Sequence, residues 1–112
     1  RGAWEGVARR FLDAGEVVHF ALEAEGWTWV DPLLLVTDRR VLHLRRGAVT
    51  RWRRIRQVPA ADVLGVEYSP WFISGIVRVR VRGGQPIRVM SKDGDLSQGF
   101  ADGVNGLIIG RR

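Results

Sequence analysis

The stretch IVRVRVRG at positions 76–83 limits how this chain can fold more than any other feature of the sequence. Successive side chains of an extended strand point to opposite sides, so the valines share one side and the arginines share the other. The arginines concerned are Arg78, Arg80 and Arg82. The stretch therefore predicts a β-strand with one apolar face and one solvated face.

Short apolar or alternating stretches bounded by turn residues recur along the chain. They predict strands at residues 16–22, 27–36, 40–44, 50–58, 62–68, 76–82 and 86–90. Asp38 is expected to fold its side chain onto nearby backbone N–H groups in a tight turn, and Gly83-Gly84 predicts a two-residue hairpin. No connector is long enough to hold a helix, so neighbouring strands are expected to pair antiparallel.

Amphipathic helices are expected at both ends of the chain, at residues 1–13 and 95–110. The apolar side of the first helix consists of Trp4, Ala8, Phe11 and Leu12. The apolar stripe of the second consists of Leu96, Phe100, Val104 and Leu107, with a cap from Asp95 or from residues 91–93.

Glycines recur beside that second stripe, at Gly99, Gly103, Gly106 and Gly110. Each glycine costs a helix about 0.8 to 1 kcal/mol relative to alanine. Such a series needs compensation from tertiary packing, and we expect another backbone to approach the helix closely on this side.

The chain has 112 residues, enough for one domain, residues 1–112, with a core of its own. Cysteine is absent, which fits a reducing compartment. No apolar run approaches the length of about 18 residues that a membrane span needs, and no secretory signal is visible. We therefore expect a cytoplasmic protein, with a peripheral membrane location as the alternative.

Three local sequences, FLDAGEVV from Phe11, LLLVTDRRVLHL from Leu33 and FADGVNGLI from Phe100, resemble those of small bacterial pleckstrin-homology-like (PH-like) domains. The resemblance covers nearly the whole chain. It implies a mainly β fold, in which a seven-stranded antiparallel barrel or sandwich is capped by a C-terminal α-helix and preceded by a short N-terminal helix.

The same resemblance implies a binding module, because bacterial PH-like domains are not enzymes as a class, and some of them assemble into rings. Eukaryotic relatives often bind phosphoinositides through basic residues at the end of the first strand and in the following loop. The matching segment here is Glu23-Ala24-Glu25-Gly26-Trp27-Thr28-Trp29, which has two carboxylates and no base. Specific phosphoinositide binding is therefore not expected.

Catalysis needs groups that converge, and the sequence offers no such set. Its two histidines, His19 and His43, fall on the first and third predicted strands with another strand between them. A metal site needs several converging donors, so neither histidine is expected to be a ligand. Phosphate-loop, dinucleotide-binding and nucleophile-elbow motifs are absent from the sequence. We expect no enzymatic activity, no cofactor and no metal.

The formal charge is +6, and all but one of the 18 basic residues are arginine, a balance that favours anionic partners. Eight arginines fall within residues 39–56, where no acid occurs. A candidate anion-binding face joins the arginines of the last two strands, with Arg82 and Arg88 brought close together. That face consists of Arg78, Arg80, Arg82 and Arg88. The alternative is a solvated face whose arginines pair with Asp38, Asp62 or Glu67.

The segment SPWFISG, residues 69–75, is expected to be a loop that carries three large apolar side chains. They are Trp71, Phe72 and Ile73. Burying each would contribute about 1.5 to 3 kcal/mol, so something should cover them. The candidates are Trp4, or Trp27 with Trp29, from the same chain, then a second copy or another protein, and then a bilayer.

These observations lead to three functional hypotheses. The first is a non-catalytic binding or scaffolding module that self-associates, or takes a protein partner, through loop 69–75. The second is a peripheral module on anionic membranes, with the arginine face and Trp71 or Trp27 as anchors. The third is nucleic-acid binding, which the sequence disfavours because the aromatic residues do not interleave with the arginines except at Trp52.

Overall fold

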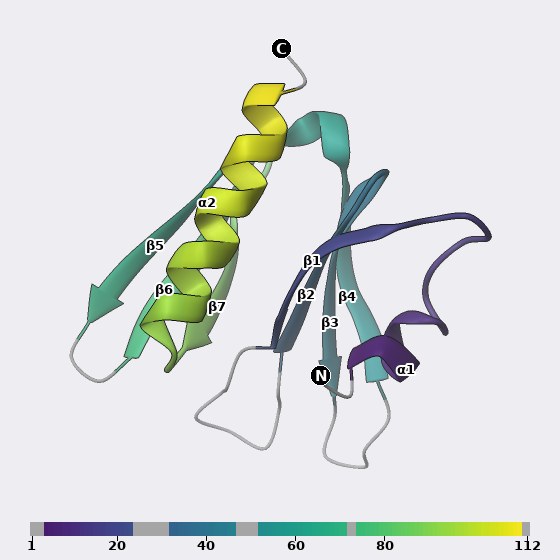
Figure 1. Ribbon diagram of the computed structural model, residues 1–112, viewed down its shortest axis with the longest axis horizontal. Helices are drawn as coiled ribbons and strands as arrows, with labels where there is room; N and C mark the ends of the chain where they lie inside the picture. The colour runs from purple at the N-terminus through teal and green to yellow at the C-terminus, as the bar shows by residue number, and fades with distance from the viewer. Residues whose placement is uncertain (1–3, 24–31, 47–51, 72–73, 111–112) are drawn as a thin grey trace.

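Seven antiparallel strands form two sheets, with a helix near each end of the chain (Figure 1). The computed structural model describes residues 4–23, 32–46, 52–71 and 74–110. The first sheet holds β1 Val18–Glu23, β2 Pro32–Thr37, β3 Arg40–Arg46 and β4 Trp52–Pro59. The second holds β5 Val63–Trp71, β6 Ser74–Val81 and β7 Ile87–Ser91. The remaining elements are α1 Trp4–Ala8, the 3-10 turn η1 Ala60–Asp62 and α2 Gly94–Gly110.

Within each sheet, every strand pairs antiparallel with the strand that follows it in the sequence. This confirms the predicted fold class of seven antiparallel strands followed by a helix. The order β1-β2-β3-β4 leaves β1 and β4 as the edges of the first sheet, and the order β5-β6-β7 leaves β5 and β7 as the edges of the second.

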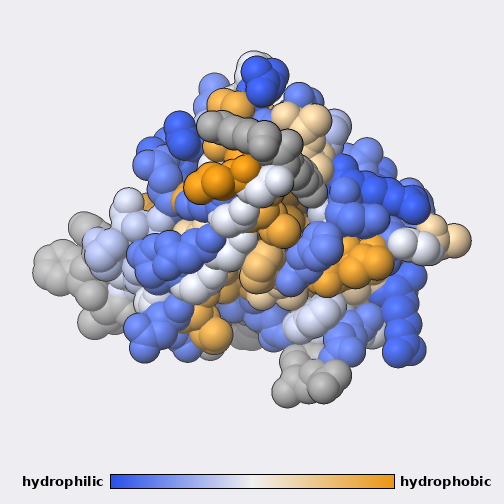
Figure 2. Space-filling model, turned by 45° about the horizontal axis from the view of Figure 1, so that its top comes forward, coloured by the Kyte–Doolittle hydropathy of each residue, from blue (hydrophilic) through white to orange (hydrophobic). Residues whose placement is uncertain are grey.

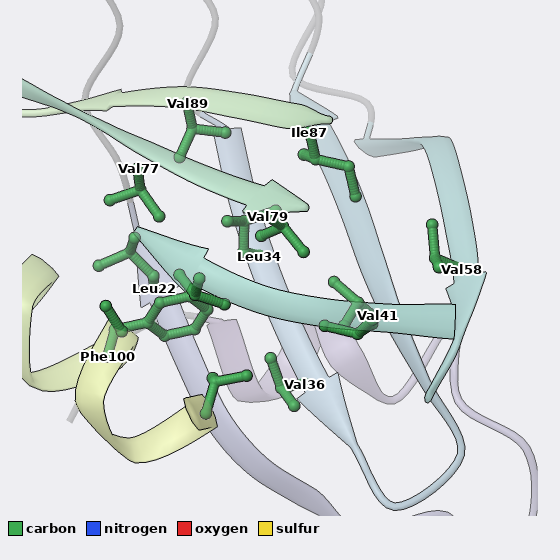
Figure 3. Close-up of a cluster of buried hydrophobic side chains, with 14 residues drawn as sticks. Leu22, Leu34, Val36, Val41, Val58, Val77, Val79, Ile87, Val89 and Phe100 are labelled. Atoms are coloured by element: carbon green, nitrogen blue, oxygen red, sulfur yellow. The ribbon is translucent and has the colours of Figure 1, made fainter. Parts of the chain in front are cut away.

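The main core lies between the two sheets and is built from alternate residues of their strands (Figure 3). The alternation predicted for β6 is confirmed, because Val77 and Val79 are fully buried while Arg78 and Arg80 are exposed. Across the core, β2 contributes Leu34 and Val36, neither of which is more than 5% exposed. Burial of these alternate side chains holds the sheets together.

A second apolar cluster covers the outer face of the β1–β4 sheet. Its fully buried members are Leu33, Leu35, Leu42 and Leu44. The N-terminal segment packs over them with the side chains of Trp4, Val7, Ala8, Phe11 and Leu12. The expected grouping of apolar residues in this segment is confirmed. The helix itself ends at Ala8, and the N–H groups of Phe11 and Leu12 both bond to the Ala8 carbonyl in a closing turn.

Helix α2 lies across the gap between the two sheets and packs mainly on β5 and β1 (Figure 1). Its buried side chains are Ser97, Phe100, Ala101 and Val104. The predicted apolar stripe is wrong at Leu96, which is 64% exposed. Ser97 takes the inward position instead, because its hydroxyl lies 2.6 Å from Ser91 Oγ and 2.7 Å from the Asp93 carbonyl oxygen. Asp93 caps the helix by accepting a hydrogen bond from the Leu96 N–H.

The helical glycines do not share one close backbone contact, so that expectation is wrong. A Cβ at Gly103 would lie 2.5 Å from the ring of Phe20, so a side chain of β1 makes the close approach there. At Gly99, Gly106 and Gly110, no atom of the described residues outside the helix's own backbone and the adjacent residues lies within 4 Å of the corresponding position. Of these four glycines, only Gly103 therefore has a packing reason in the described part of the chain.

Two of the predicted connections differ from the structure. Residues 69–71 and 74–75, expected to belong to a loop, are strand residues, because β5 continues to Trp71 and β6 begins at Ser74, with these two residues paired. The β6–β7 connection is longer than a two-residue turn and runs from residue 82 to 86, with Gly83 in the left-handed region at φ 68°. The register consequently places Arg88 opposite Arg78, not next to Arg82.

A buried ion pair ties the N-terminal segment to the turn between β2 and β3. Arg40 donates two hydrogen bonds to Glu16, from Nε to Oε2 at 3.0 Å and from Nη2 to Oε1 at 2.9 Å. Thr37 donates a third from Oγ1 to Glu16 Oε2 at 2.6 Å. The Arg40 guanidinium also bonds to the Phe11 carbonyl and to Gln57. These donors lower the pKa of Glu16 from 4.5 to about 2, with the Arg40 hydrogen bonds as the largest cause.

The turn between β2 and β3 is closed by Thr37 and not by Asp38 as expected. Thr37 Oγ1 accepts hydrogen bonds from the N–H groups of Arg39 and Arg40. Asp38 reaches away from the turn instead, and its Oδ1 accepts a hydrogen bond from the Val17 N–H. In the sequence TDRR, Thr37 therefore closes the turn, while Asp38 and Arg40 bind the N-terminal segment.

Asn105 of α2 binds the backbone of β5, which is an edge strand. Its Oδ1 accepts a hydrogen bond from the Val66 N–H, and its Nδ2 donates one to the Val66 carbonyl, both at 2.8 Å. The amide satisfies two backbone groups as a neighbouring strand would. Helix α2 is thereby fixed in position along β5.

Replacing Glu16 with Gln should destabilise the protein most at neutral pH. Breaking a buried ion pair typically costs about 3 to 5 kcal/mol, and here it leaves Arg40 with only the exposed Asp13 carboxylate, 3.8 Å away. Because the pKa of Glu16 is depressed on folding, its contribution is present above pH 4.5 and is lost as the pH falls towards 2. The difference in unfolding free energy between wild type and Glu16→Gln should therefore shrink by up to about 3 kcal/mol over that interval.

Urea unfolding measured at several pH values would test this expectation. Asp102→Asn is the matched control, since Asp102 is an exposed carboxylate on α2 that accepts a hydrogen bond from Gln98. A Glu16→Gln variant as stable as wild type at neutral pH would contradict the assigned role of the ion pair.

Replacing Asn105 with Ala should lower the free energy of unfolding by about 1 to 3 kcal/mol, because the two Val66 backbone groups lose their partners. Hydrogen exchange at the Val66 N–H should accelerate by more than the global destabilisation explains. The control is Gln98→Ala on the exposed side of the same helix. Unchanged protection of Val66 would refute the proposed link between α2 and β5.

Candidate anion-binding surfaces

The four arginines predicted to form an anion-binding face lie on the outer side of the β5–β7 sheet. All four are exposed. Arg78 and Arg88 are direct neighbours across β6 and β7, and Glu67 of β5 is the other neighbour of Arg78. We call Arg78, Arg80, Arg82 and Arg88 the outer arginines.

Acidic residues accompany two of the outer arginines. Arg80 Nε lies 3.4 Å from Glu67 Oε1, and Arg82 Nε lies 3.9 Å from Asp62 Oδ1. These pairs match the alternative in which Glu67 and Asp62 neutralise part of the face, and Arg39 likewise lies 4.0 Å from Asp38. Exposed pairs of this kind contribute little to stability, but they reduce the positive field that a ligand would meet.

The predicted protein contact lies at the end of the β5–β6 hairpin. Phe72 and Ile73 fall outside the described residues, and for Trp71 only the backbone, in β5, is described. Trp4, one suggested cover for this contact, belongs instead to the cluster on the outer face of the β1–β4 sheet. Trp27 and Trp29 lie outside the described residues.

Exposed aliphatic side chains elsewhere are scattered. The most exposed are Leu96 at 64% and Ile109 at 69%, which lie near opposite ends of α2. On the face shown in Figure 2, apolar side chains form separate patches among hydrophilic ones. Scattered aliphatic residues are normal on a folded surface and do not indicate an interface.

A second group of basic residues lies on the inner face of the first sheet, which is the face that packs on the main core. The group is at the end of β3 and the start of β4. Register places His43 between Leu34 of β2 and Arg56 of β4. In the next inward-facing row, Arg45 lies between Pro32 and Arg53. Leu34 belongs to the main core, so this group lies on the same face of the sheet, next to the edge of the core. We call His43, Arg45, Arg53 and Arg56 the basic cluster.

An irregularity in β4 brings the cluster together. The pairing shifts between His43 and Leu44, whose partners on β4 are Arg56 and Arg54, so Ile55 is an extra residue in that strand. Strict alternation would group Arg54 with Arg56. The bulge instead puts Arg53 and Arg56 on the inner side, with Arg54 opposite the outward-facing Leu44.

No arginine of the basic cluster has an ion-pair partner within the described part of the chain. Arg45 and Arg53 are direct cross-strand neighbours and repel each other. Arg56 donates a hydrogen bond from Nη1 to the Gln85 carbonyl, so the β6–β7 turn borders the cluster. Arg45 and Arg53 are exposed, whereas His43 and Arg56 are half-buried. The cluster thus runs from the edge of the core to open surface, and no carboxylate of the described residues pairs with its arginines.

His43 is the half-buried member at the inner end of the cluster. Burial lowers the pKa of its imidazole below the ordinary value, and the positive charges of Arg45 and Arg56 lower it further. His43 is therefore neutral at neutral pH. It lies on β3 and His19 on β1, with β2 between them, as expected.

Other possible sites are poorly supported in the described residues. No group of three or more histidine or acidic side chains there could hold a metal ion. None of the helices in that part of the chain has the length and apolar character that a bilayer span requires. A hollow of about 450 Å³ between the end of β1 and the start of α2 is lined by Glu23, Asp93 and Asp95 together with Lys92. Of the segment expected to oppose phosphoinositide binding, Glu23 is described and 24–29 is not.

Comparison with known proteins gives one informative result. No protein-family model and no curated protein matches the chain. Among solved structures, the crystal structure of a pleckstrin homology domain from Shewanella amazonensis is similar, with a TM-score of 0.58 and 16% sequence identity. The similarity covers 93% of this chain and 97% of that one. This similarity, together with the two antiparallel sheets of four and three strands and the C-terminal helix, shows that the chain has the PH-like fold.

Proposed function

We propose that this PH-like chain is a non-catalytic binding module that holds an anionic partner on the basic cluster. The observation that carries the proposal is the set of three arginines on one face with no carboxylate within ion-pair distance in the described residues. Clustered like charges raise the energy of the ligand-free protein, and a bound anion removes that repulsion.

The surroundings of the cluster support it over the outer arginines as the binding surface. The outer arginines lie on an open sheet face and share it with Glu67 and Asp62. The basic cluster is bordered by the core residue Leu34 on one side and by the β6–β7 turn on another. Charges near a low-dielectric wall interact more strongly with a ligand than charges surrounded by water.

The position of Trp52 argues against a single-stranded nucleic acid as the partner. Base stacking needs aromatic rings on the same surface as the basic groups. Trp52 packs in the apolar cluster on the outer face of the first sheet, and its neighbour in the ladder is Arg46. No described Phe, Tyr or Trp of β3 or β4 faces inwards beside the arginines.

Charge reversal at one arginine pair of each surface should distinguish them. Arg45→Glu/Arg53→Glu reverses a cross-strand pair of the basic cluster, and Arg78→Glu/Arg88→Glu reverses the equivalent pair of the outer arginines. The net charge changes equally in both. Binding of a sulfated polysaccharide, measured by calorimetry, should fall at least tenfold in the first variant and by much less in the second.

The same two variants test the membrane alternative by sedimentation with phosphatidylserine-containing vesicles. If Arg78→Glu/Arg88→Glu lost more binding than Arg45→Glu/Arg53→Glu, to the polysaccharide or to the vesicles, the outer arginines would be the binding surface instead. Equal losses in both variants would show attraction by net charge alone and would refute the proposed site.

A second proposal is self-association through segment 69–75. It is favoured by the hairpin itself, in which the Trp71–Ser74 pair lies one step beyond the last β6–β7 pair, Gly75–Ser91. Large apolar side chains at such an end would contribute about 1.5 to 3 kcal/mol each when a second copy buries them.

Light scattering with size-exclusion chromatography would test self-association. We expect an oligomer for the wild-type protein and a monomer for Trp71→Ser/Phe72→Ser. The control is Ile109→Ser, which changes an exposed apolar residue near the C-terminal end of α2, outside segment 69–75. A monomeric wild-type protein at high concentration would refute self-association and leave the anion-binding proposal intact.

A further inference from the structure

The position of His43 connects anion binding to protonation. Its imidazole shares the inner face of the first sheet with the three arginines of the basic cluster. Its cross-strand neighbours are Leu34, which is fully buried, and Arg56, and the next inward residue of its own strand is Arg45. Within the described part of the first sheet, the neighbours of His43 on this face are therefore either apolar or positively charged.

We propose that His43 makes the basic cluster a proton-linked site, which binds multiply charged sulfate- or phosphate-type groups more tightly as the pH falls below neutral. The inference rests on the proposed function, because it concerns the same cluster, and it adds the regulation of that site. An anion bound by Arg45, Arg53 and Arg56 lies on the same face as His43 and adds negative charge beside the imidazole.

The physical reason is a change of sign in the field at His43. Without a ligand, protonation is opposed by burial and by the charges of Arg45 and Arg56, which is why the pKa of His43 lies below its ordinary value. With a multiply charged anion in place, the nearest net charge becomes negative and stabilises the imidazolium form. An opposite charge within about 4 to 6 Å typically shifts a pKa by about 1 to 3 units.

Linkage then fixes the direction of the effect on affinity. Because anion binding raises the pKa of His43, protonation of His43 must strengthen anion binding by the same factor. The affinity increases as the pH falls from the raised pKa of the complex to the lowered pKa of the free protein. A shift of about one unit corresponds to about a tenfold change in affinity.

The polar partners of the arginines do not cancel this effect. Within the described residues, Arg56 bonds to the neutral Gln85 carbonyl, and Arg45 and Arg53 have no carboxylate partner. The acids that form ion pairs belong to other surfaces, namely Asp13, Glu16 and Asp38 near the β2–β3 turn and Asp62 and Glu67 near the outer arginines. His43 is therefore the member of this cluster that can gain a proton as the pH falls below neutral.

The test uses inositol hexasulfate, whose sulfate esters stay fully ionised from about pH 5.5 to about pH 7.5, so any pH dependence belongs to the protein. Calorimetry on the wild-type chain should give an affinity about tenfold higher at the lower pH. His43→Gln should bind equally at both pH values. His19→Gln is the matched control and should keep the wild-type pH dependence, because His19 lies on β1 with β2 between it and β3.

An NMR titration of the wild-type protein gives a second readout that needs no variant. The pKa of the His43 ring should rise when inositol hexasulfate is added. An unchanged His43 pKa, a pH-independent wild-type affinity, or a pH dependence that persists in His43→Gln would each overturn the inference while the proposed function stands.

Absence of wild-type binding at both pH values would overturn the proposed function itself, and the inference with it. Phosphatidylserine-containing vesicles, tested at the same two pH values, distinguish a lipid surface from a soluble anion as the source of the charged group. Proton-linked binding of the soluble probe without vesicle binding would assign the site to a soluble ligand.

Discussion

Burial of both faces of the β1–β4 sheet is the constraint on which the rest of this structure depends. The run Leu33-Leu34-Leu35-Val36 cannot alternate between apolar and polar, so β2 sends Leu34 and Val36 into the main core and Leu33 and Leu35 to the outside. Without a cover, the outer leucines would face water. The N-terminal segment supplies that cover, and the Glu16–Arg40 ion pair attaches it to the β2–β3 turn.

The sequence was sufficient where one local rule decided the outcome. Alternation predicted which residues of β6 are buried, and the absence of helical connectors predicted antiparallel neighbours. Sequence reasoning failed where the burial of a polar group depends on its hydrogen-bond partners. Ser97 lies inside because Ser91 and Asp93 bond to it, and Glu16 lies under Arg40, 24 positions away. Hydropathy patterns contain no information on either arrangement.

The basic cluster shows the same limit at the candidate site. An acid-free segment with eight arginines could be seen in the sequence, but the face that each one occupies could not. That depends on the extra residue Ile55, which pairs Arg56 with His43 and Arg54 with Leu44. Strict alternation of side chains along β4, without a bulge, would put Arg54 and Arg56 on one face and Arg53 on the other. The register fixed by the β2–β3 turn then decides that His43 and Arg45 face inwards.

Two sets of arginines on one small protein can therefore differ in chemistry although the residue type is the same. The outer arginines stand in water beside Glu67 and Asp62, where their charge is partly neutralised and is screened by salt. The inner ones begin where the core ends, at Leu34 and His43, with no acid beside them in the described residues. An anion entering there replaces repulsion with attraction, and part of its water shell is exchanged for fixed donors. On our proposal, the gain per charge is greatest at the half-buried end of the cluster, beside His43 and Arg56, where water screens least.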